Sequence, residues 1–167
     1  MDELIKKIST YNIFNNILPG AVFVLFSSRM GMIKMEFNNM VIELFVYYFV
    51  GLVISRIGSI IIEQFLKWIR LVKFIEYKQY IAATKNDTNI ELLSEINNMY
   101  RSILATIICI FIFKVYIVII EYNLILKSYS KEIVLVCVFI LFLVSYRKQT
   151  AYITNRVESQ QKSIING

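Results

Sequence analysis

Charged side chains within apolar runs are the residues of this sequence best suited to carry a function. The run 41–62 contains Glu43 near one end and Arg56 near the other, and the run 103–120 contains Lys114. An ionisable side chain inside a membrane segment costs free energy and commonly marks an ion path or an ion pair. Glu43 and Lys114 both fall in the outer halves of their runs, so they are able to meet. We predict that the three are intramembrane charges, as pairs, as snorkelling cations or as the lining of a pore.

Enzyme chemistry is not indicated by the residue types. The sequence has no His, and Cys109 and Cys137 both lie in apolar runs. No P-loop, no G-x-S-x-G motif and no zinc or redox cysteine spacing occurs. We therefore expect no catalytic residues, no metal site and no cofactor, and we do not expect an enzyme.

The composition indicates a membrane protein. Of 167 residues, 57% are hydrophobic and 18% are charged, and the net charge is +6. Soluble domains average about 45–50% apolar and about 25% charged residues. The excess of apolar residues and the shortage of charge predict a small multi-pass membrane protein.

Four apolar runs are candidates for membrane spans, near 13–28, 41–62, 103–120 and 133–145. A helix of 18 residues reaches about 27 Å, close to the hydrocarbon thickness of a bilayer. The first run is interrupted by a Pro-Gly pair and competes with a cleaved signal peptide. Its acidic flank and poor cleavage site favour a retained helix. We predict four spans and keep a three-span arrangement open.

The distribution of basic residues predicts the orientation. Both termini and the segment 63–102 together carry 12 Lys and Arg, and the two short loops carry 4. By the positive-inside rule, the termini are cytoplasmic. The predicted fold is all-α, with four transmembrane helices, N-in and C-in. It divides into a membrane hairpin (1–62), a cytoplasmic helical hairpin (63–102), a second membrane hairpin (103–145) and a basic tail (146–167).

The cytoplasmic hairpin is expected to extend the second and third spans. Apolar residues at helical spacing continue the second span to Val72, and a helix starting near Asn89 runs into the third span. Thr88 and Glu91 match a capping box at its start. Basic residues of the hairpin and tail would bind anionic lipid, a protein partner or an anionic ligand such as a nucleotide or oligonucleotide, whose bases nearby tyrosines would stack. These basic residues are Arg70, Lys73, Lys78, Arg101, Arg147 and Lys148.

A row of small residues predicts close helix packing in the second span. The row comprises Gly51, Ser55 and Ser59, with Gly58 beside it. Such residues let two helix backbones approach one another in a bilayer. The partner helix belongs either to the same chain or to another copy, and thin spans with this row favour a homo-oligomer.

Four short segments carry a resemblance to a known class of protein. They are Leu-Pro-Gly at 18–20, Ser-Arg-Ile-Gly-Ser at 55–59, Asn-Asn-Met-Tyr-Arg-Ser at 97–102 and Tyr-Arg-Lys-Gln-Thr at 146–150. This pattern resembles membrane components of prokaryotic anti-phage defence operons, of the Kiwa or Hailong kind. The resemblance implies a homo-oligomer, with a tetramer favoured, in the bacterial inner membrane. It also implies sensing of infection, or opening as an ion channel under control of a cytoplasmic partner or a nucleic-acid-like ligand.

Two functions follow as expectations. The first is an oligomeric membrane effector, a gated channel or membrane-perturbing assembly whose basic hairpin receives the signal. The second is a non-conducting scaffold that anchors a cytoplasmic partner. A transporter is disfavoured, because the two halves of the chain show no internal repeat.

Overall fold

The computed structural model describes residues 2–87 and 89–165, with side chains from residue 15 to residue 161 except at 78, 85 and 88. All the regular elements within this part of the chain are helices. They are α1 (Asp2–Arg29), α2 (Met40–Ile57), the π-helical turn η1 (Gly58–Ile62), α3 (Glu63–Trp68), α4 (Tyr77–Asn86), α5 (Asn89–Tyr122), α6 (Leu124–Ser128) and α7 (Ser130–Ile165).

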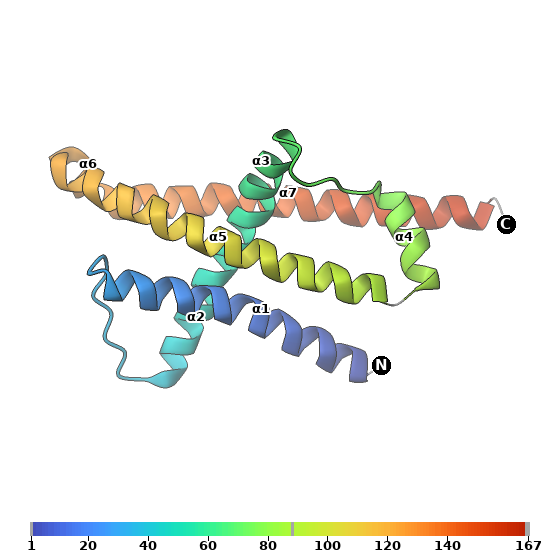
Figure 1. Ribbon diagram of the computed structural model, residues 1–167, viewed down its shortest axis with the longest axis horizontal. Coiled ribbons are helices and arrows are strands. Elements are labelled where there is room, and N and C mark those ends of the chain that lie inside the picture. The colour runs from blue at the N-terminus through green and yellow to red at the C-terminus, as the bar shows by residue number, and fades with distance from the viewer. Residues whose placement is uncertain (1, 88, 166–167) are drawn as a thin grey trace.

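The long helices lie in two directions. Figure 1 shows α1, α5 and α7 running along the long axis of the molecule, while α2, η1 and α3 form one rod that crosses them steeply. This rod passes between α5 and α7, and it contacts α1, α5 and α7. The rod is therefore the element that joins the other helices.

The predicted all-α fold is confirmed. Among the described residues, three helical stretches are long and apolar enough to cross a membrane, which supports a membrane protein: Met40–Trp68, Asn89–Tyr122 and Ser130–Gln161. They contain the predicted second, third and fourth spans. Side chains of α1 are described only from residue 15, so the four-span count stays a prediction, as do the orientation and the cytoplasmic hairpin.

Helices α1 and α2 cross with their backbones in contact. A Cβ added to Gly20 would lie 1.8 Å from the Tyr47 carbonyl oxygen, and one added to Gly51 would lie 1.7 Å from the Asn16 carbonyl oxygen. Only hydrogen atoms fit at this crossing. The predicted small-residue packing thus occurs within one chain, and it depends on a glycine in each helix.

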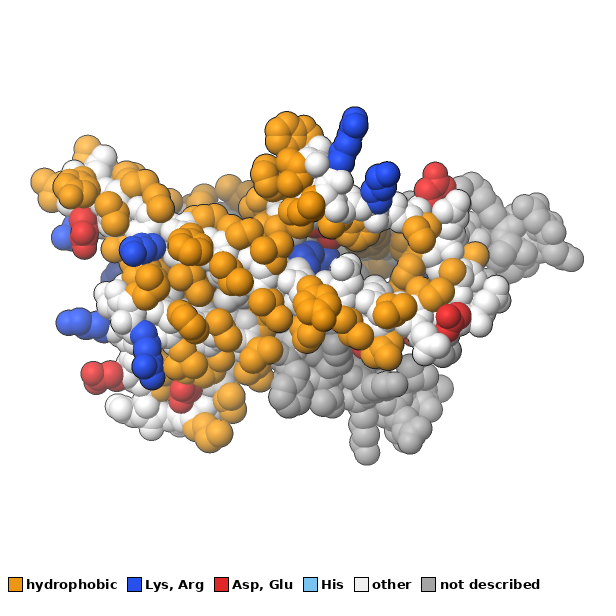
Figure 2. All heavy atoms as spheres, viewed as in Figure 1, with side chains coloured by type: hydrophobic (Ala, Val, Ile, Leu, Met, Phe, Trp, Pro, Cys, Tyr) orange, Lys and Arg blue, Asp and Glu red, His pale blue; other side chains and the backbone are white. Residues whose placement is uncertain are grey.

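The core lies where the rod meets α1 and α5. Ile54 and Ile62 of the rod are buried against Ala105 and Cys109 of α5, and Phe23 of α1 packs on this group. Polar residues are buried as well, among them Ser55, Ser102 and Thr106. Large apolar side chains instead cover much of the surface seen in Figure 2. This distribution is typical of a protein whose solvent is lipid.

The predicted helix through Val72 ends earlier, at Trp68. The Arg70 amide donates to the Lys67 carbonyl at 3.0 Å, the Leu71 amide donates to the Leu66 carbonyl at 3.0 Å, and Arg70 has φ = 60°. This is the Schellman arrangement, in which a left-handed residue stops the helix. Apolar residues at helical spacing continue beyond Trp68 to Val72, so the sequence pattern alone did not show where the helix ends. Residues 69–76 are non-helical and lead to α4.

Replacing Arg70 with Gly should raise the stability of the protein by about 1 kcal/mol, because a left-handed conformation is costly for a residue with a Cβ. Helix α1 provides the control. Gly31 ends it with φ = 70° and with equivalent hydrogen bonds, from the Gly31 amide to the Ser28 carbonyl and from the Met32 amide to the Ser27 carbonyl. Gly31→Ala should lower the stability by a similar amount. Unfolding in detergent measures both, and equal stability of the Gly and Arg forms at position 70 would contradict the argument.

Helices α5 and α7 extend the predicted third and fourth spans. Helix α5 begins at Asn89 as predicted, and the Asp87 carboxylate accepts from the Asn89 amide at 2.9 Å; Thr88 of the predicted capping box lies outside the described residues. Helix α7 runs without a break from Ser130 into the predicted tail, as far as Ile165. The tail packs on α4, where the rings of Tyr77 and Tyr152 lie 5.9 Å apart.

Candidate functional site

A buried carboxylate lies where the rod meets α5 and α7. The Glu63 side chain is 7% exposed, and its Oε2 lies 2.7 Å from Nη1 of Arg101 on α5. Its Oε1 lies 2.9 Å from Nζ of Lys67 and 3.9 Å from Nζ of Lys148 on α7. We call Glu63, Lys67, Arg101 and Lys148 the Glu63 cluster. It joins three helices of the chain through charge.

Ser59 of the π-helical turn η1 accepts hydrogen bonds from a cation of the cluster. The Lys148 ammonium donates to the Ser59 carbonyl at 2.7 Å and to its hydroxyl at 2.8 Å. On the side of η1 that faces α5, a Cβ at Gly58 would lie 3.2 Å from Cβ of Ala105. The short side chains of Gly58 and Ser59 therefore let α5 and α7 approach the rod closely enough for their cations to reach Glu63.

The cluster lies at the ends of three apolar runs. Glu63 directly follows the run 41–62, Arg101 precedes the run 103–120, and Lys148 follows the run 133–145. Charged side chains at such positions belong near the boundary between hydrocarbon and headgroups. The sequence therefore predicts that all three lie near one boundary, on the side to which the Lys and Arg count assigns the cytoplasm.

The cluster carries more positive than negative charge. One carboxylate faces three cations, and all three remain partly accessible, with side chains 20–35% exposed. The Arg101 Nε and the neighbouring Ser102 hydroxyl are buried without a hydrogen-bond partner among the described residues. Buried donors of this kind are normally paired. Beside Glu63, these two groups are the buried polar atoms of α5 that the described residues leave unpaired.

Glu63 and Lys67 were not identified as site residues from the sequence. Both occupy positions between the apolar residues that continue the second span, and nothing in that spacing distinguishes them from other helical charges. The fold instead buries Glu63. Its position directly after an apolar run was the one available signal.

The predicted intramembrane charges do not pair with each other. Glu43 accepts a hydrogen bond from the Tyr47 hydroxyl. Lys114 is exposed, Arg56 is partly exposed, and the ion pairs among the described residues include none of the three. The possible contact between Glu43 and Lys114 is thus absent from this structure.

The predicted basic set divides into two groups. Arg101 and Lys148 belong to the Glu63 cluster. Arg70, Lys73 and Arg147 are exposed, and the side chain of Lys78 lies outside the described residues. The four small residues of the second span pack within the chain: Gly51 on α1, Gly58 on α5 and Ser59 on α7, with Ser55 buried.

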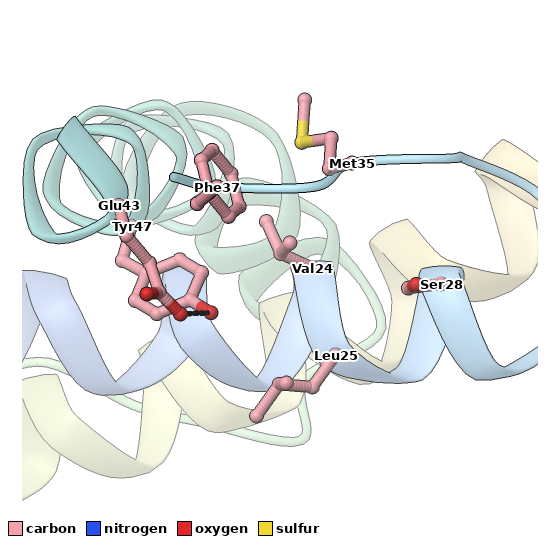
Figure 3. Close-up of a pocket in the computed structure, with 7 residues that line it drawn as sticks. All are labelled: Val24, Leu25, Ser28, Met35, Phe37, Glu43 and Tyr47. Carbon is pink, nitrogen blue, oxygen red and sulfur yellow. Dashed lines mark hydrogen bonds between the residues drawn. The ribbon is translucent and has the colours of Figure 1, made fainter. Parts of the chain in front are cut away.

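A small pocket lies at the other end of α2. Figure 3 shows Val24, Leu25 and Ser28 of α1, Met35 and Phe37 of the following loop, and Glu43 and Tyr47 of α2 around a volume of about 230 Å³. The hydrogen bond from Tyr47 to Glu43 occupies the polar part of this pocket. In the part of the chain that the structure describes, no group of three or more Cys, Asp or Glu side chains could hold a metal ion.

Comparisons with protein-family models, with curated proteins and with solved structures found no match to this chain. Three of the four segments that carry the sequence resemblance meet at the candidate site, because Ser59, Arg101 and Lys148 come from the segments 55–59, 97–102 and 146–150.

Proposed function

We propose that this protein is a subunit of an oligomeric membrane effector or sensor whose state is controlled by the Glu63 cluster. The observation that carries the proposal is the burial of Glu63 between cations of α5 and α7 at the ends of three apolar runs. A carboxylate buried inside a protein is costly unless cations pair with it, so a competitor for those cations would act on a sensitive point of the fold. A ligand or partner that competes for these charges would separate the helices.

Conduction of ions is the activity we favour. Buried polar groups line the contacts of the rod with its neighbours, and Ser55, Ser102 and Thr106 are among them. In the 18-residue stretch of α7 that is apolar enough to span a membrane, only 6% of the residues are buried within the chain. This exposed face supports contacts between copies, and a conducting path would lie among the assembled subunits. The resemblance to anti-phage defence components supports a role in arresting infected cells.

Planar-bilayer recording tests this function. Glu63→Gln should produce discrete current steps without any added trigger, because it removes the charge that holds α5 and α7 to the rod. Wild-type protein should stay silent until cytosolic extract from infected cells is added. Glu43→Gln is the matched control, since Glu43 is a carboxylate of the same rod outside the cluster.

The second candidate is a non-conducting scaffold that anchors a cytoplasmic partner. The contact between the rings of Tyr77 of α4 and Tyr152 of α7 favours it, because both residues lie beyond the apolar runs. Silence of the wild type and of Glu63→Gln, with an intact oligomer shown by light scattering, would support the scaffold and reject conduction.

A further inference from the structure

The end of α3 and the linker that follows it expose large apolar side chains. Trp68 is 78% exposed, and Leu71 and Ile75 are 71% and 72% exposed. Phe65 and Phe74 are also largely exposed. Side chains of this size are rarely left in water in such density, and they mark a surface that contacts lipid or protein. We call residues 65–75 the interfacial segment.

Cations alternate with these apolar residues. Arg70 and Lys73 are exposed and belong to none of the ion pairs among the described residues. Figure 2 shows protruding cations beside apolar side chains at the end of α3 and the beginning of the linker. An aromatic residue next to unpaired cations matches the chemistry of a membrane interface, where rings lie at headgroup level and cations bind phosphate.

The local fold keeps this surface together. The rings of Phe65 and Trp68 lie 6.0 Å apart, and the Lys67 ammonium lies 4.1 Å from the centre of the Phe74 ring. The Schellman stop at Arg70 turns the chain at the end of α3, and the Phe74 ring then lies against Lys67 of that helix. Arg70 adopts a left-handed backbone conformation that Gly adopts more readily. An arginine at this position therefore costs stability, which points to a use for its charge.

The position of the segment identifies the partner. It begins two residues after Glu63, at the boundary where the three apolar runs end. We propose that the interfacial segment docks on the membrane that this chain spans, with Trp68, Leu71 and Ile75 at the acyl boundary and Arg70 and Lys73 on the phosphates of anionic lipids. This inference concerns lipid recognition, and it does not depend on whether the protein conducts ions.

Trp68 is the sole tryptophan of the sequence, so its fluorescence reports on this segment alone. Full-length protein would be reconstituted in vesicles of phosphatidylcholine with or without phosphatidylglycerol. Lipids brominated near the headgroup should quench Trp68 more than lipids brominated deep in the chains, and anionic lipid should increase this quenching while acrylamide quenching falls. Removal of the cations in Arg70→Gln/Lys73→Gln should lower the ratio of docked to undocked segment on the order of fivefold per cation.

The matched control is Lys127→Gln/Lys131→Gln, which removes the same charge from two exposed lysines in another part of the chain. It should leave the lipid dependence of Trp68 unchanged. Two results would overturn the proposal. Acrylamide access equal to that of free tryptophan in both lipids would place the segment in water. Protection from both acrylamide and brominated lipid would show that a second copy of the chain covers it.

Discussion

Replacing Glu63 with Ala will destabilise the protein by about 3–5 kcal/mol, the usual cost of removing one partner from a buried ion pair. The variant leaves the Arg101 guanidinium without its only ion-pair partner among the described residues. Lys148 keeps its two Ser59 acceptors and is affected less. Unfolding of the purified protein in mixed micelles by increasing sodium dodecyl sulfate gives the free energy of unfolding.

Two variants separate the charge effect from lost packing. The triple substitution Glu63→Met, Arg101→Met and Lys148→Met should regain most of the stability, because apolar residues of similar volume replace the three most buried charges. Lys67 loses its partner too, but its side chain is 35% exposed and can be solvated by water. Glu43→Ala removes a carboxylate with one hydrogen-bond partner, Tyr47, and should cost only about 1 kcal/mol. Equal losses of unfolding free energy for Glu63→Ala and Glu43→Ala would mean that the ion pairs of the Glu63 cluster add no more stability than a single hydrogen bond.

Substituting Gly51 with Ala will separate α1 from α2. The added methyl group would lie 1.7 Å from the Asn16 carbonyl oxygen, and a backbone atom cannot yield as a side chain does. We expect a loss of at least about 3 kcal/mol, at the upper end of the usual cost of overpacking. Phe23 of α1 packs on the core that contains Cys109, so the separation should expose this thiol.

The labelling rate of Cys109 measures this separation. The sequence has two cysteines, and Cys137 is exposed, so Cys137→Ala leaves one buried thiol as the reporter. Gly51→Ala in this background should label many times faster with a maleimide. Gly58→Ala is the matched control. Its Cβ would lie 3.2 Å from Cβ of Ala105 and no closer than 3.6 Å to any atom of Arg101, so it should cost about 1 kcal/mol. Indistinguishable rates for the two variants would disprove the backbone contact.

The helices themselves were largely predictable, because apolar run length is a direct consequence of bilayer thickness. The start of α5 at Asn89 and the small residues of α2 also followed from local patterns. The steep crossing of the rod did not. It depends on the contact of Gly20 with Gly51, and a sequence does not say which of several glycines face each other.

The candidate site was predictable only in part. Arg101 and Lys148 were identified as basic residues of interest, but they were expected to bind an external anion. Their contacts with Glu63 join positions that are 38 and 85 residues apart in the chain. Charge pairing over such separations depends on tertiary register, which local periodicity does not contain.

The π-helical turn determines that register. The Glu63 amide donates to the Gly58 carbonyl, five residues earlier, so η1 contains one residue more per turn than the helices around it. Conversion of this turn to an α-helix would rotate α3 relative to α2 by about 100°, the angle of one helical residue. Such a rotation would carry the Glu63 carboxylate off the face shared with Arg101 and Lys148, and would swing residues 69–76 around the axis of the rod. A change in the winding of η1 would therefore alter the ion pairs of Glu63 and the position of residues 69–76 at the same time.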